Sequence, residues 1–158
     1  MILAIDPGNT QSAYVVMDSD TCKPVDFGKG DNAELLDYIM QYREKSDTDV
    51  AIEMVACYGM PVGREVFDTA FWIGRYFEQC RDFRRVGLIY RSEEKMCICG
   101  TMRAKDSNIR QALVDRFASH DLKSGKGTKN NRDFFYGFKS DIWQAFAVGY
   151  TYRQKGIA

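Results

Sequence analysis

The first thirty residues alternate short apolar runs with turn-forming residues, a pattern typical of strands. Residues 2–6 read as a short buried strand. The Pro7-Gly8-Asn9 turn that follows lets a second strand, at residues 12–17, return beside the first. A third strand is predicted at residues 25–29, so the chain is expected to open with a meander of three strands.

After this meander the apolar spacing changes to that of helices alternating with strands. Asp31 or Asn32 is expected to cap a helix that runs to about residue 45, with one apolar stripe made of Leu35, Leu36, Ile39 and Met40. Further strands are predicted at residues 50–55, 86–90 and 96–99, and further helices at residues 63–81, at residues 106–118 and from near Ser140. Strands in a meander followed by this alternation predict an α/β fold, a mixed sheet with helices packed on its faces.

Two segments depart from this regular pattern. The helix predicted at residues 63–81 carries apolar residues on more than one stripe, so part of its surface is expected to meet a partner subunit. Residues 119–140 are basic and glycine-rich without apolar periodicity, and we expect a mobile loop there.

The length of 158 residues and the apolar content of 45% predict a single domain, residues 1–158, with a core of its own. No apolar run is long enough to cross a bilayer, and no signal peptide opens the chain, so we expect a cytoplasmic protein without membrane contact. The five scattered cysteines fit reduced thiols. A zinc site is not expected, because His120 is the only histidine and no C-x2-C pair occurs.

The formal net charge of zero hides an asymmetry between the two halves of the chain. Residues 1–80 carry six Lys and Arg against fourteen Asp and Glu, whereas residues 81–158 carry sixteen against eight. Such a distribution can arise by chance on a solvated surface. It also fits a basic face for a phosphate backbone, contributed mainly by the second half.

Three carboxylates stand at positions that call for an explanation. Asp6 ends the first strand, Glu53 is a charge inside the apolar run of residues 50–55, and Asp141 opens the last helix. Singly, Asp6 and Glu53 could face water or an arginine, and Asp141 could serve as a helix cap. Brought together, the three would repel one another, and a divalent cation would relieve that repulsion. All-oxygen ligands favour Mg²⁺ or Mn²⁺ over zinc.

The segments around these carboxylates resemble those of the RuvC-type Holliday junction resolvases over nearly the whole chain. Ile2-Leu3-Ala4-Ile5-Asp6-Pro7-Gly8 is similar to the family's first catalytic strand, Ala51-Ile52-Glu53 to its second, and Asp141-Ile142-Trp143-Gln144-Ala145-Phe146-Ala147 to its last helix. The resemblance implies the RNase H-like fold, with a mixed five-stranded sheet and helices on both faces. It further implies a homodimeric crossover junction endodeoxyribonuclease that cuts four-way DNA with two Mg²⁺ or Mn²⁺ ions per active site.

The sequence departs from the family's pattern at Gln144. The family usually has two aspartates three residues apart at the start of the last helix, and here Asp141 matches the first while Gln144 matches the second. An amide oxygen can still bind a metal or water but carries no charge. Asp133 is a candidate substitute, although a solvated loop aspartate is the simpler interpretation. The departure is what we expect of a divergent branch of the family, such as a phage-encoded one.

The resemblance also points to basic and apolar residues that would contact DNA. Lys95 and Lys105 fall near the positions of the family's catalytic lysines, and Tyr58 or Met60 would form a wedge between bases at the crossover. A wider basic patch would follow the backbone, and DNA could order the loop that bears part of it: Arg103, Arg110, Lys123, Lys126, Lys129, Arg132 and Lys139. The alternatives are ordinary exposed lysines and a tyrosine that covers the core.

Three other functions stay open on the sequence. A related RNase H-like nuclease could act on RNA or RNA–DNA hybrids, since a fold does not fix the substrate. The loss of charge at Gln144 also allows a non-catalytic DNA-binding relative. The segment from Asp6 to Thr10 is similar to the first phosphate loop of the actin and sugar-kinase superfamily, but 158 residues supply only one of the two lobes that such a kinase needs.

Overall fold

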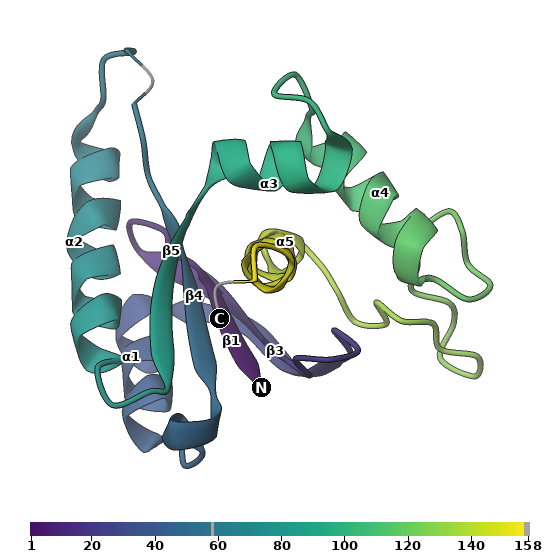
Figure 1. The fold of residues 1–158 in the computed structure, drawn as a ribbon, viewed down its shortest axis with the longest axis horizontal. Coiled ribbons are helices and arrows are strands. Elements are labelled where there is room, and N and C mark those ends of the chain that lie inside the picture. Colours follow the sequence, from purple (N-terminus) through teal and green to yellow (C-terminus); the bar gives the residue numbers. More distant parts are fainter. Residues whose placement is uncertain (58, 157–158) are drawn as a thin grey trace.

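The computed structural model describes residues 1–57 and 59–156, and its centre is a five-stranded sheet in the order β3-β2-β1-β4-β5 (Figure 1). The strands are β1 (Ile2–Asp6), β2 (Gln11–Met17), β3 (Pro24–Asp31), β4 (Asp49–Met54) and β5 (Arg85–Tyr90). β1, β2 and β3 pair antiparallel, whereas β1 pairs with β4 and β4 with β5 in parallel. The prediction of a meander that continues into a mixed sheet is therefore confirmed.

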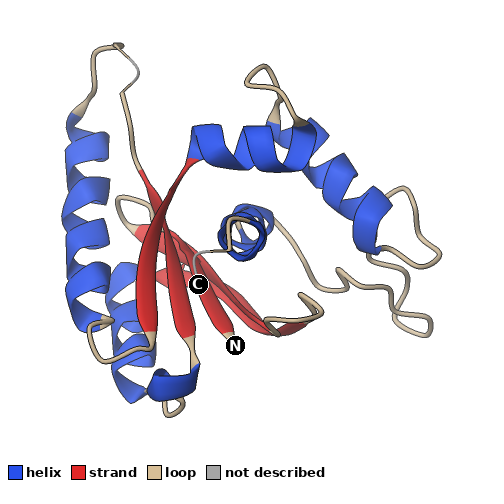
Figure 2. Cartoon of the chain, in the orientation of Figure 1, coloured by secondary structure: helices blue, strands red, loops and turns tan. Residues whose placement is uncertain are grey.

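Helices cover both faces of this sheet, as predicted (Figure 2). One face is covered by α1 (Asn32–Gln41) and α2 (Arg64–Gln79), and the other by α5 (Ile142–Gln154), beyond which lie α3 (Arg91–Cys99) and α4 (Asp106–Phe117). A short 3-10 helix, Lys45–Asp47, precedes β4. None of the helices in the described part of the chain has the length and apolar character needed to cross a bilayer.

The alternation of side chains along β1 and β4 decides which face each carboxylate occupies. Leu3, Ile5 and Ile52 are buried in the cluster under α1 and α2. Ile2 and Ala51 belong to the cluster under α5. Because side chains alternate with a period of two, Asp6 and Glu53 lie on the α5 side of the sheet, at the carboxyl ends of two adjacent parallel strands.

A glycine lets α5 lie directly against the strands that carry the site. A Cβ atom added to Gly149 would stand 2.8 Å from the Cβ of Ala4 and 3.0 Å from the sulfur of Met17. Both are closer than ordinary van der Waals contact, so a side chain at this position would push the helix away from β1 and β2. Gly149 thereby fixes the height of α5, and with it the height of Gln144, above the sheet.

One predicted strand is part of a helix, and one helix ends earlier than predicted. Residues 96–99, expected as a strand, form the end of helix α3, in which Glu94 and Ile98 are buried one turn apart. The Glu93 carboxylate accepts the backbone N–H of Tyr90 at 2.8 Å and so caps the start of this helix. The first helix ends at Gln41 rather than at about residue 45.

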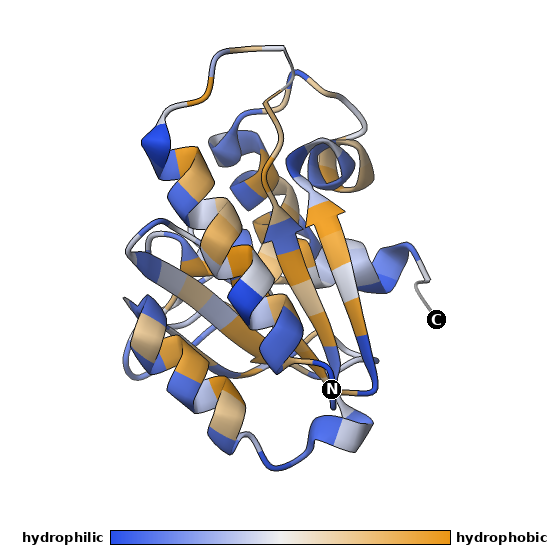
Figure 3. Ribbon diagram, turned by 90° about the vertical axis from the view of Figure 1, so that its left-hand side faces the viewer, coloured by the Kyte–Doolittle hydropathy of each residue, from blue (hydrophilic) through white to orange (hydrophobic). Residues whose placement is uncertain are grey.

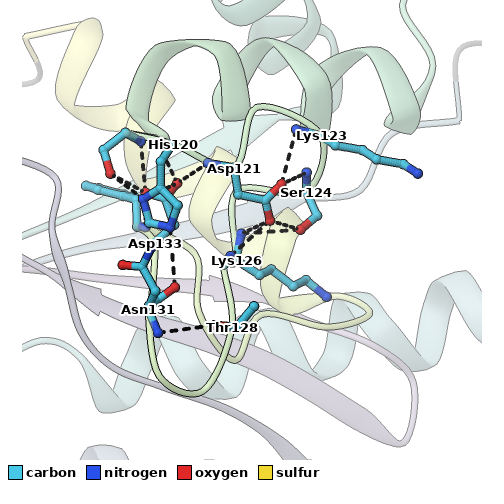
Figure 4. A network of polar contacts seen from close by, with 11 residues as sticks. His120, Asp121, Lys123, Ser124, Lys126, Thr128, Asn131 and Asp133 are labelled. Atoms are coloured by element: carbon cyan, nitrogen blue, oxygen red, sulfur yellow. Dashed lines mark hydrogen bonds and ion pairs between the residues drawn. The ribbon is translucent and has the colours of Figure 1, made fainter.

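Residues 119–140, expected as a mobile loop, are held by two buried or half-buried aspartates (Figure 4). The Asp133 carboxylate accepts backbone N–H groups within 2.9 Å from Ser119, His120, Asp121 and Phe134. Asp121 accepts backbone N–H groups from Lys123, Ser124, Lys126 and Gly127. Each of these two carboxylates accepts four backbone hydrogen bonds, and such charge-assisted bonds hold the loop in one conformation. The expectation of a mobile loop was therefore wrong.

Candidate active site

Asp6 and Glu53 meet at the ends of β1 and β4. Ile5 pairs with Ile52 in the parallel register, so the two carboxylates occupy the next position on each strand. Burial raises the pKa of Asp6 well above its ordinary value, and the nearby Glu53 carboxylate raises it further by repulsion. Burial also raises the pKa of Glu53, and the contact with Asp6 offsets part of that rise.

The first turn of α5 lies above this pair. The Gln144 amide nitrogen donates to Oε2 of Glu53 at 3.2 Å. Asp141, at the N-cap of α5, is close enough for its charge to raise the pKa of Asp6. The Asp141 side chain is exposed and forms an ion pair of 2.5 Å with Lys29 on β3. The structure therefore brings Asp6, Glu53 and Gln144 together and leaves Asp141 at the rim of the site.

A fourth carboxylate, Glu94 on α3, adjoins the site and was not predicted from the sequence. The Gln144 amide nitrogen donates to Oε2 of Glu94 as well as to Glu53. Glu94 has no exposed surface, and its Oε1 atom has no hydrogen-bond partner among the described residues. Burial, with repulsion from Glu53, raises the pKa of Glu94 to about 8. The sequence contains one indication that Glu94 is buried: it stands four positions before the apolar Ile98. In a helix this spacing places both side chains on the same face, but residues 96–99 were predicted as a strand.

The chemistry of these donors suits a divalent cation. Carboxylate and amide oxygens are the ligands that Mg²⁺ and Mn²⁺ prefer, and a buried carboxylate oxygen without a partner is a group that a cation would satisfy. As the side chains stand, no three Asp, Glu, His or Cys residues in the described ranges are grouped closely enough to hold a metal. The Gln144 amide nitrogen bonds to both Glu53 and Glu94.

Comparison with known proteins finds its matches at the level of structure. No family model and no curated protein matches the sequence. The structure of RuvC from Thermus thermophilus superposes with a TM-score of 0.66 at 14% identity, covering 98% of this chain and 96% of that one. The structure titled T. thermophilus RuvC in complex with Holliday junction substrate superposes with a TM-score of 0.61 at 12% identity, covering 96% and 91%. This chain has the RuvC fold.

The RuvC fold is an RNase H-like fold, so the fold expected from the resemblance is confirmed. The shared architecture extends over nearly the full length of both chains, from the first strand to the last helix. At 12–14% identity the similarity concerns the path of the backbone. The role of each side chain must therefore be inferred from the contacts that it makes in this structure.

The two lysines expected near the scissile phosphate lie on separate elements. Lys95 is half-buried on α3, next to Glu94 in the sequence. Lys105 is exposed at the N-cap of α4. Met60 is 72% exposed in the loop after β4, a position open to a binding partner. Tyr58, the other candidate for a wedge, lies outside the described residues.

The predicted basic patch lies mainly on α4 and on the loop that Asp121 and Asp133 organise. Two of its arginines cover aromatic rings: Arg110 lies 5.2 Å from the ring centre of Trp143, and Arg132 lies 4.5 Å from that of Tyr136. The remaining members are exposed or half-buried: Arg103, Lys123, Lys126, Lys129 and Lys139. Lys126 and Lys123 appear with the loop network in Figure 4.

A small cavity of about 160 Å³ connects this patch to the site. It lies between α4 and the start of α5, and its lining residues include Arg110, Asp141 and Gln144. A cationic side chain on one wall and the candidate ligands on the other give a polar recess beside Asp141.

Asp133 is not a substitute ligand. Its two carboxylate oxygens are committed to the backbone N–H groups of the loop, and these bonds hold its pKa well below the ordinary range. A carboxylate used in this way has a structural role. Asp133 is also buried, so the interpretation of it as a solvated loop aspartate was wrong as well.

Proposed function

We propose that this protein is a metal-dependent endonuclease that cuts branched DNA, with four-way junctions as its substrate, by paired hydrolysis of phosphodiester bonds. One observation carries the proposal: Asp6 and Glu53 form a half-buried carboxyl pair on adjacent parallel strands, directly under the first turn of α5. Partly buried acidic groups that shift one another's pKa are typical of functional sites. The RuvC fold of the chain agrees with this chemistry.

In this proposal Asp6, Glu53 and Asp141 hold the metal, and the Gln144 side chain contributes its amide oxygen. Bound Mg²⁺ or Mn²⁺, as two ions per site, would activate a water molecule and stabilise the leaving oxygen of the phosphodiester. The residues themselves set up the site. To hold the ion, Asp6 would have to be ionised and Asp141 would have to leave its ion pair with Lys29.

Basic side chains on the second half of the chain support the assignment of DNA as substrate. Lys95 and Lys105 would neutralise the phosphate next to the cut, and the basic loop around Lys126 and Arg132 would follow the backbone. The second structural neighbour was solved with a Holliday junction, which favours branched DNA over other polyanions. Residues 81–158 hold eight more basic than acidic side chains, the asymmetry that phosphate binding needs.

Paired cuts require two active sites, and α2 offers a surface for a homodimer. Phe67 and Phe71 are each 65% exposed on this helix. Phe71 also lines a shallow groove with Leu36, Ala70 and Gly74, between α2 and α1. In Figure 3, which views the molecule from this side, hydrophobic positions alternate with hydrophilic ones along α2. An apolar surface of this kind is what a subunit contact buries.

A cleavage assay with three substrates tests the proposed function. The protein is incubated with Mg²⁺ and a synthetic four-way junction, a linear duplex or an RNA–DNA hybrid, beside the variants Asp6→Asn and Glu53→Gln. We expect symmetric nicks near the crossover on the junction alone. Both variants should lose cutting by a factor of about 10³ or more while they still bind the junction, because they remove charge and leave the basic surface intact.

Each other outcome points to a different function. Cutting that survives Asp6→Asn would reject the site, and preferential cutting of the hybrid would make this a nuclease of RNA-containing duplexes. Tight junction binding without cutting by the wild-type protein, in either Mg²⁺ or Mn²⁺, would identify a non-catalytic DNA-binding protein.

A further inference from the structure

We propose that Glu94 is an additional metal-binding carboxylate of this site, supplied by α3, and that it provides the charge that Gln144 lacks. The inference rests on the proposed function, because it assigns one more residue to the same site. Glu94 lies outside the segments around Asp6, Glu53 and Asp141 that suggested the metal site, on a helix that the sequence did not predict.

The burial of Glu94 is the first reason. Its side chain has no exposed surface, and carboxylates are almost never buried completely unless a cation or hydrogen bonds satisfy them. The partners of Glu94 all converge on one oxygen: Oε2 receives the guanidinium of Arg91 at 2.5 Å and the amide of Gln144. Oε1 is buried without a partner in the described residues. Oε1 is therefore available to bind a cation.

The position of the Gln144 amide is the second reason. Its nitrogen donates to Oε2 of Glu53 and to Oε2 of Glu94, so the two carboxylates face a common point. The N–H groups of an amide carry partial positive charge, and here they occupy the place that a cation shared by the two carboxylates would take. A turn of the same amide would present its oxygen to that cation.

An ion pair with Arg91 is the alternative explanation, and it accounts for only part of the geometry. Arg91 has a second partner, the exposed Asp106, at 2.5 Å, so it does not depend on Glu94 for charge balance. An ion pair built for stability would engage both oxygens of Glu94, as bidentate pairs do. The observed contact leaves Oε1 unused.

The neighbouring Glu93 supplies an internal control. It lies on the same helix, its Oε2 accepts the backbone N–H of Tyr90, and its Oε1 pairs with Lys155. Both oxygens of Glu93 are therefore accounted for by the protein, and it faces away from the site toward the chain end. Glu93→Gln removes the same charge from the same helix without touching the site.

Metal affinity in the absence of DNA tests the proposal. Binding of Mn²⁺ is measured by electron paramagnetic resonance for the wild-type protein, Glu94→Gln, Glu93→Gln and Asp6→Asn, and folding is checked by thermal melting in chelator. We expect Glu94→Gln and Asp6→Asn to weaken Mn²⁺ binding at least tenfold. Glu93→Gln should stay within about twofold of the wild type, because the hydrogen bonds of Glu93 go to Tyr90 and Lys155 and not to Gln144.

The pattern of results separates this inference from the proposed function. If Asp6→Asn loses Mn²⁺ and Glu94→Gln binds as well as Glu93→Gln, the role of Glu94 is rejected and the site stands. If neither variant changes the affinity, the metal site itself is rejected. A wild-type measurement covers the case in which Glu94→Gln does not fold: on addition of Mg²⁺ to protein with ¹³C-labelled glutamate, the carboxyl resonances of Glu94 and Glu53 should shift while that of Glu93 stays. A Glu94 resonance that does not move overturns the proposal.

Discussion

Asp6 occupies a position where its ionised form is disfavoured, and this has a measurable consequence for stability. Burial and the Glu53 carboxylate raise its pKa well above the ordinary value near 4. A group whose pKa is raised in the folded state stabilises the fold at pH values below its unfolded pKa, and this contribution disappears as the pH rises through the folded pKa. In chelator, the free energy of unfolding should therefore fall as the pH increases from about 4 to above 8, the value to which the pKa of Glu94 is raised.

The first prediction concerns Asp6→Asn in chelator. At pH 8 this variant should be more stable than the wild type by about 1–3 kcal/mol, because asparagine removes the repulsion that Asp6 suffers when ionised. At pH 4 the two proteins should unfold alike. Chemical denaturation at both pH values measures the difference, with the exposed Asp82→Asn as control. A variant that is less stable than the wild type at pH 8 would mean that Asp6 stabilises the fold and is not a strained functional group.

Among the residues of the candidate site, the sequence identified those on strands better than those on helices. Asp6 and Glu53 stand out because each interrupts or ends an apolar run, and burial of a charge demands a partner. Glu94 lies in the charged stretch Arg91-Ser92-Glu93-Glu94-Lys95, where every residue resembles a solvated one. Its burial depends on α5 packing against α3, a contact between segments about fifty residues apart. No local pattern carries that information.

The elements were predicted where the periodicity was long and missed where it was short. The strands of the meander and helix α2 were found because several consecutive repeats agree. Residues 96–99 offered only four positions, and a short apolar run does not distinguish a strand from the last turn of a helix. The loop of residues 119–140 was misjudged for another reason: its order comes from hydrogen bonds to Asp121 and Asp133, and such bonds leave no apolar pattern.

The second prediction concerns the loop that carries part of the basic patch. Asp133→Ala removes the acceptor for four backbone N–H groups, so the amides of Ser119, His120 and Asp121 should exchange with deuterium much faster. The melting temperature should fall by roughly 5 °C or more. Since the pKa of Asp133 is held below its ordinary range, the stability that it contributes is present above about pH 4 and is lost on acidification.

Asp115→Asn is the matched control for this loop, because Asp115 is an exposed aspartate on the neighbouring helix α4. Its melting temperature and exchange rates should stay close to those of the wild type. If Asp133→Ala leaves the exchange of residues 119–121 unchanged, the loop is held by its aromatic side chains. Phe135 and Phe138, both buried, would then be the residues responsible.

At the scale of the whole molecule, the candidate site lies on one face of the sheet, and a helix with exposed apolar side chains covers the other. The candidate site, the cavity beside it and the basic loop all lie on the side of α5, α3 and α4. The exposed phenylalanines of α2 lie on the opposite side of the sheet. Two copies joined through α2 would therefore keep both active sites open, which is the arrangement that paired incision of one junction needs.

The last prediction tests this arrangement with the double variant Phe67→Glu/Phe71→Glu. Glutamate at two positions of an apolar interface should weaken self-association by at least about 100-fold, because the two subunits could join there only by burying both charges. Sedimentation should then change from dimer to monomer.

On a plasmid that extrudes a cruciform, the wild-type protein should produce linear DNA by cutting both strands in one encounter, whereas the variant should accumulate nicked circles. Val25→Glu, which places one glutamate at another exposed apolar position, should leave both results unchanged. A variant that still sediments as a dimer would place the subunit interface elsewhere than on α2, and a wild-type monomer that linearises the plasmid would show that paired cutting here needs no stable dimer.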